Sequence, residues 1–178
     1  MSAFLQRLRA FTRIVATGIL AGVAYGLVHD QITAHLCVEY FTVGHPTIVE
    51  TKSPLVLGLL WGVIATWWAG AILGALLGLA ATLGPWPAVS ARQLHRPILR
   101  LLGAMALGAA IMGPVGYLLA RDDRLYLHPW LVQTIHPTDP AIYQRVWFAH
   151  NASYGFAALG GLMLSASTLV GRIRAARA

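Results

Sequence analysis

The sequence predicts an all-α integral membrane protein, built as a bundle of four transmembrane helices. Of the 178 residues, 57% are hydrophobic and only 11% are charged, whereas roughly 25% are charged in an ordinary soluble domain. Four apolar runs follow one another along the chain, and a helix needs about 20 apolar residues to cross a bilayer. Basic residues gather beside these runs. We therefore expect a single transmembrane domain, residues 1–178, with lipid as its solvent.

The first apolar run is short, because only residues 14–28 separate Arg13 from His29. An arginine-rich segment followed by a short apolar run also resembles a secretory signal peptide. Small residues fill the whole run, however, and do not mark one cleavage site. We expect an uncleaved helix that continues outward, so that the first span covers about 12–41. His29 and Asp30 would then lie within the membrane.

The other three runs have clear boundaries. Ser53-Pro54 and Asp139-Pro140 each place an N-cap residue before a first-turn proline, which predicts the start of the second and fourth helices. The third run has arginine at both ends. Small residues recur at every fourth position in three of the four runs, and this spacing lets helix backbones approach closely in lipid. The expected spans are about 54–83, 98–120 and 140–171.

The basic residues predict the orientation. Nine of the thirteen lie at the N-terminus, between the second and third runs, or at the C-terminus: Arg7, Arg9, Arg13, Arg92, Arg96, Arg100, Arg172, Arg174 and Arg177. Positive residues favour the cytoplasmic side, so we expect a multi-pass protein of the inner membrane of the cell with both termini in the cytoplasm. The net charge of +7 is thus assigned to helix ends, which predicts the lipid bilayer as partner and no nucleic acid.

All six acids and six of the seven histidines then fall on the extracytoplasmic side. The densest stretch, 29–46, holds His29, Asp30, His35, Glu39 and His45. On one straight helix His35 and Glu39 share a face that His29 does not, so either two sites exist or the helix breaks before Glu39.

The fourth run brings further polar residues to a similar depth. Counting about 1.5 Å per residue from the cytoplasmic arginines places His29 and His150 roughly 24 Å and 33 Å outward. We expect the bundle to place His29, Asp30, His150 and Asn151 around one cavity. Ionisable groups within a membrane are costly unless paired or wet, and they suggest function.

This chemistry points to an integral membrane metal-binding protein with its site at the extracytoplasmic end. Imidazole together with carboxylate suits zinc or ferrous iron. The chain lacks the His-Glu-x-x-His motif and the paired Glu-x-x-His motif of di-iron proteins, so the sequence leaves open whether the protein is an enzyme. The candidate metal ligands are His29, His35, Glu39, His45 and His150. Asp30 and Glu39 are the candidate catalytic carboxylates, Asp30 as an orienting group or proton acceptor.

Two other functions are compatible with the same residues. His29 and His150, as cofactor-binding residues, could be the axial ligands of a b-type haem between the first and fourth helices. Alternatively, the chain is a non-catalytic subunit that packs against other membrane subunits. His45, His128 and His136 each precede a proline in the outer loops, and we expect a histidine-rich cap there, in which each histidine alone can equally be an interfacial hydrogen-bonding residue.

Overall fold

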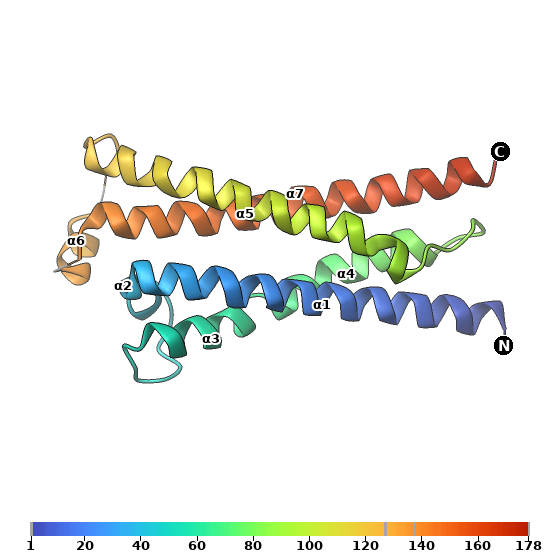
Figure 1. Cartoon of the computed structure of the whole chain (residues 1–178), viewed down its shortest axis with the longest axis horizontal. Coiled ribbons are helices and arrows are strands. Elements are labelled where there is room, and N and C mark those ends of the chain that lie inside the picture. Colours follow the sequence, from blue (N-terminus) through green and yellow to red (C-terminus); the bar gives the residue numbers. More distant parts are fainter. Residues whose placement is uncertain (1, 127, 137, 178) are drawn as a thin grey trace.

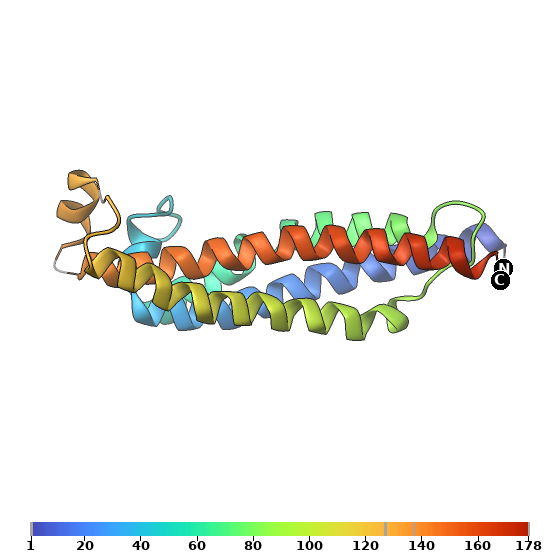
Figure 2. The same ribbon diagram turned by 90° about the horizontal axis from the view of Figure 1, so that it is seen from above.

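The computed structural model describes residues 2–126, 128–136 and 138–177, and within them every regular element is a helix. Four segments are long and apolar enough to cross a membrane, which confirms the predicted all-α fold class and its four apolar spans. The long helices run along one axis and both termini lie at the same end (Figures 1 and 2). The helices are α1 (Ala3–Leu36), α2 (Val38–Thr42), α3 (Pro54–Ile64), α4 (Trp67–Thr82), α5 (Ala91–Arg121), α6 (Pro129–Ile135) and α7 (Pro140–Ala175).

The long helices pack as two groups. Helix α1 packs against α3 and α4, and α5 packs against α7, as Figure 1 shows. Facing glycines allow α1 and α4 to pack closely. A Cβ atom on Gly18 would lie only 2.8 Å from the Cα atom of Gly74. The predicted close approach of helix backbones through small residues is therefore present between α1 and α4.

The first span ends earlier than predicted. Helix α1 stops at Leu36, because Cys37 adopts an extended conformation with φ −153° and ψ 96°. The short helix α2 then brings Tyr40 and Phe41 into a buried cluster with Trp61 of α3. Burial of these aromatic rings favours the break over the predicted continuation to residue 41.

The second span is also interrupted, whereas the sequence predicts one helix over 54–83. Helices α3 and α4 are separated at Ala65 and Thr66. The hydroxyl of Thr66 donates a hydrogen bond of 2.5 Å to the carbonyl of Gly62, a local bond of the kind that bends helices. Gly26 of α1 lies against this turn, and a Cβ atom there would collide with Thr66. At this interruption the backbone of α1 therefore packs closely against the turn between α3 and α4.

Two arginines hold together the end of the bundle where the termini lie. Arg7 comes from α1 and Arg172, which is only 3% exposed, comes from α7. The last carbonyls of a helix have no partner within the helix, and here the arginines supply one. Their guanidinium groups donate hydrogen bonds to carbonyls at the end of α4 and in the loop after it, those of Ala80, Thr82, Gly84, Trp86 and Pro87.

We expect Arg172→Ala to lower the free energy of unfolding by about 2–4 kcal/mol, because hydrogen bonds from a charged group contribute about 1.5–3 kcal/mol each and the carbonyls lose their donor. Thermal unfolding in detergent measures the effect. Arg174→Ala is the matched control, since Arg174 is exposed on the same helix. Equal unfolding temperatures for the two variants would contradict this role of Arg172.

Candidate metal centre

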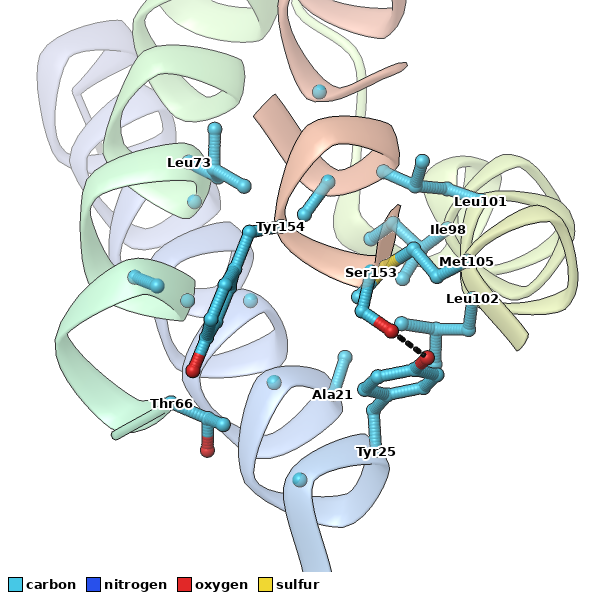
Figure 3. A pocket seen from close by; sticks show the side chains of 18 of the residues that line it. Ala21, Tyr25, Thr66, Leu73, Ile98, Leu101, Leu102, Met105, Ser153 and Tyr154 are labelled. Atoms are coloured by element: carbon cyan, nitrogen blue, oxygen red, sulfur yellow. Dashed lines mark hydrogen bonds between the residues drawn. The ribbon is translucent and has the colours of Figure 1, made fainter. Parts of the chain in front are cut away.

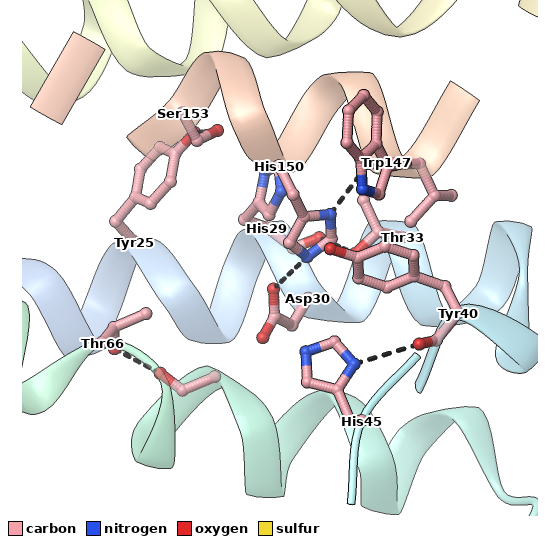
Figure 4. Close-up of polar contacts among 12 residues, drawn as sticks. Tyr25, His29, Asp30, Thr33, Tyr40, His45, Thr66, Trp147, His150 and Ser153 are labelled. Carbon is pink, nitrogen blue, oxygen red and sulfur yellow. Dashed lines mark hydrogen bonds and ion pairs between the residues drawn. The ribbon is translucent and has the colours of Figure 1, made fainter. Parts of the chain in front are cut away.

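Three ionisable side chains meet between α1 and α7. His29 and Asp30 come from α1 and His150 comes from α7, and one ligand atom of each lies within 4.8 Å of the other two. Asp30 and His150 are 4% and 3% exposed. The Nε2 atom of His150 lies 3.2 Å from the Oδ1 atom of Asp30, as Figure 4 shows. The structure thus brings together three of the predicted residues from two spans.

The hydrogen bonds of His150 require a proton or a cation between its ring and Asp30. Its Nδ1 atom lies 2.9 Å from the carbonyl oxygen of Val146, which can only accept. A neutral imidazole has one donor nitrogen and one acceptor nitrogen, so the Nε2 atom then presents a lone pair to the carboxylate of Asp30. That contact is favourable only when a proton or a metal cation lies between the two atoms.

His29 adds a second ring nitrogen that could bind a metal. Within the described part of the chain its Nε2 atom is buried and has no hydrogen-bond partner. The ring contacts that of His150 edge to face, with ring centroids 4.5 Å apart, and it stacks on Tyr25. A buried polar atom without a partner costs about 1–3 kcal/mol. A cation bound by this nitrogen would remove that cost.

The segment after α1 covers the cluster. The ring of Tyr40 lies 4.4 Å from that of His150 and 5.1 Å from that of His45. His45 contacts Trp61, and its Nδ1 atom lies 3.0 Å from the backbone carbonyl of Tyr40. Burial lowers the pKa of His45 and raises that of Tyr40, so both side chains are neutral near pH 7. His45 therefore borders the three clustered residues without being one of them.

The other predicted ligands lie elsewhere. His35 is exposed, and its Nδ1 atom lies 2.7 Å from the carbonyl of Gln31 in its own helix. Glu39 lies beyond the break at Cys37 and accepts a bond of 3.6 Å from the thiol of that residue. The break before Glu39 was one of the two expected alternatives, and it leaves both residues outside the cluster.

The expectation that Asn151 faces the same cavity is wrong. Its side chain is exposed, and the amide donates to the carbonyl of Trp147 one turn earlier, because it follows His150 by about 100° around the helix. His128 accepts a bond from the backbone N–H of Trp130 and caps α6, and His136 is exposed. Neither belongs to the three clustered residues.

Sequence reasoning missed two hydroxyl groups beside the cluster. The hydroxyls of Tyr25 and Ser153 lie 2.7 Å apart and join α1 to α7. Helical spacing could have found both, because Tyr25 is four residues before His29 and Ser153 is three after His150, and residues so spaced share a helix face.

The contact between the rings of His29 and His150 fits a single metal ion better than it fits the haem alternative. The two axial ligands of a haem lie on opposite faces of the macrocycle, so a haem would have to separate the rings of His29 and His150. These rings contact each other directly. Opening a slot of that width would break the bond between His150 and Asp30 as well.

Fold and cluster together define a class: an all-helical protein with four potential membrane spans and a His-Asp-His cluster, two of its three residues buried, that could hold a metal ion. Comparisons with protein-family models, with curated proteins and with solved structures found no match. The function is therefore inferred from the cluster itself.

Proposed function

We propose that the chain is an integral membrane protein that binds one divalent transition metal, zinc or iron(II), through His29, Asp30 and His150. The observation that carries this proposal is the convergence of two imidazole nitrogens and one carboxylate in a buried place, where His29 Nε2 has no partner among the described residues. Two histidines and one carboxylate form the ligand set of many zinc enzymes and of the iron(II) facial triad.

The surroundings of His150 support this proposal. A metal-bound histidine almost always donates its other ring N–H to a carbonyl or carboxylate, which fixes the ring. The Nδ1 atom of His150 has such a partner in the carbonyl of Val146, at 2.9 Å. Ligand atoms about 2.1 Å from a tetrahedral metal lie about 3.4 Å apart. The Nε2 atom of His150 and the Oδ1 atom of Asp30 are already 3.2 Å apart, so mainly the side chain of His29, now within 4.8 Å of both, would move inward by about 1 Å.

Three protein ligands leave a coordination position open, and a metal with an open position polarises bound water or a substrate oxygen. The carboxylate oxygen of Asp30 that does not bind the metal would accept a hydrogen bond from that water. We place the site at the extracytoplasmic end of an inner-membrane protein, because nine arginines lie toward the other end and positive residues favour the cytoplasmic side.

Metal analysis of the purified protein, prepared without a histidine tag, tests the proposal. About one zinc or iron per chain is expected in the unaltered protein, and His29→Ala and His150→Ala should lose it because each removes one of three ligands. His35→Ala is the matched control, since this exposed histidine lies on α1 outside the cluster. A protein that binds no metal, or whose metal both cluster variants retain, would overturn the proposal.

A further inference from the structure

A cavity leads away from the metal cluster along the seam between the two groups of helices. It lies between α1 and α4 on one side and α5 and α7 on the other, and it encloses about 880 Å³ including its open mouth. Along α1 the lining extends from Asp30 to Gly18, which corresponds to about 18 Å of helix.

The two ends of this cavity differ in chemistry. His29, Asp30, His150 and the hydrogen-bonded pair of Tyr25 and Ser153 line one end. The remainder, which we call the shaft, is lined mainly by glycine, alanine, leucine and methionine; Figure 3 shows part of it with Tyr25 and Ser153 at its polar end. The far end of the shaft is lined by Leu77, Ile98 and Leu164.

The shape and charge of the cavity indicate which kind of molecule would bind there. The hydrocarbon part of one leaflet is about 15 Å deep, so the cavity, about 18 Å long from Asp30 to Gly18, is long enough for one lipid tail. A hydrocarbon chain bound there would gain packing contacts with the apolar walls. At the polar end, a divalent cation bound by a single carboxylate retains one positive charge. An anionic oxygen donor would neutralise that charge and fill the open coordination position.

We propose that this cavity binds a single long hydrocarbon chain that carries a carboxylate head group. The chain lies in the shaft, and the head group binds at the cluster of His29, Asp30 and His150. The hydroxyls of Tyr25 and Ser153 line the same end of the cavity as the cluster and would donate to the second carboxylate oxygen. The placement of the chain rests on the cavity alone, whereas the placement of the head group rests on the proposed metal site.

Binding of radiolabelled palmitate to the purified, delipidated and metal-loaded protein tests the inference. The unaltered chain should bind about one palmitate, and Ala157→Phe should weaken binding by at least about tenfold, because Ala157 lines the shaft and a benzyl group would occupy it. Ala158→Phe is the matched control, since the adjacent alanine is exposed and does not line the cavity. Palmitate binding that Ala157→Phe leaves unchanged would overturn the inference.

A second arm tests the head group. Methyl palmitate has the same chain without the charge and should bind at least about tenfold more weakly than palmitate; equal binding would overturn the placement of the head group. Metal content is measured on the same samples. Ala157→Phe should keep its metal, so loss of palmitate binding with retained metal supports the shaft specifically. If metal-free protein still binds palmitate and Ala157→Phe abolishes that binding, the result supports the shaft even if the metal proposal fails.

Should Ala157→Phe not fold, as judged by its thermal unfolding, Ala69→Phe fills the shaft from α4. The same loss of palmitate binding is expected, and unchanged binding by this folded variant overturns the inference.

Discussion

In the metal-free protein, Asp30→Ala is expected to lower the free energy of unfolding by about 3–5 kcal/mol. Removing one partner of a buried ion pair leaves the other group buried without compensation. Here His150 is 3% exposed, and it would keep its bond to the carbonyl of Val146 while its Nε2 atom lost its partner at 3.2 Å. Thermal or chemical unfolding in detergent, with chelator present, measures the change.

A double variant separates loss of the pair from general damage. Asp30→Ala/His150→Phe removes both polar partners, and replacing both partners of a buried pair by apolar groups is often nearly neutral. Its stability should therefore exceed that of Asp30→Ala alone. Asp122→Ala serves as a control, because Asp122 forms an exposed ion pair with Arg121 at 3.5 Å and such pairs contribute about 0–1 kcal/mol. An Asp30→Ala variant no less stable than Asp122→Ala would show that the buried pair is absent.

The four apolar spans can be predicted from sequence because lipid imposes a simple requirement. Within a bilayer every backbone N–H and C=O must be satisfied within the protein, which only helices and closed barrels achieve. Long uncharged runs such as 54–83 therefore indicate helices without any knowledge of tertiary contacts. The first-turn prolines Pro54 and Pro140 predict two helix starts, and the structure has both.

The interruptions cannot be predicted in this way, because tertiary contacts decide them. Thr66 lies in an apolar run that is compatible with a continuous helix, and only the approach of Gly26 shows why the turn is placed there. Similarly, Cys37 carries no signal of an extended conformation. The helix ends there because the burial of Tyr40 and Phe41 against α3 outweighs one more turn of α1.

The same tertiary contacts decide which candidate ligands lie in the cluster and which lie outside it. Counting residues from the arginines brings His29, Asp30 and His150 to comparable depth, because rise per residue is nearly constant in a helix. The count cannot say where α1 ends, so it retains His35 and Glu39 as ligands. Nor does it anticipate Tyr40, which contacts His150 because the chain turns back after α2 (Figure 4). His45, a candidate ligand from the sequence, contacts Tyr40 and borders the cluster.

Metal binding should also be visible as stabilisation of the folded protein. A ligand present at 100 times its dissociation constant stabilises the folded state by about 2.7 kcal/mol, and about 2–4 °C of unfolding temperature per kcal/mol is typical of a chain of this length. Adding zinc, or iron(II) without oxygen, to metal-free protein should therefore raise its unfolding temperature by about 5–10 °C. The metal with the larger effect at equal concentration binds more tightly.

Asp30→Asn keeps the shape of the side chain but not its charge, so the rise should be lost in that variant. His35→Ala should show the full rise, because His35 is exposed and lies outside the cluster. A rise of equal size in Asp30→Asn would place the bound metal elsewhere in the protein.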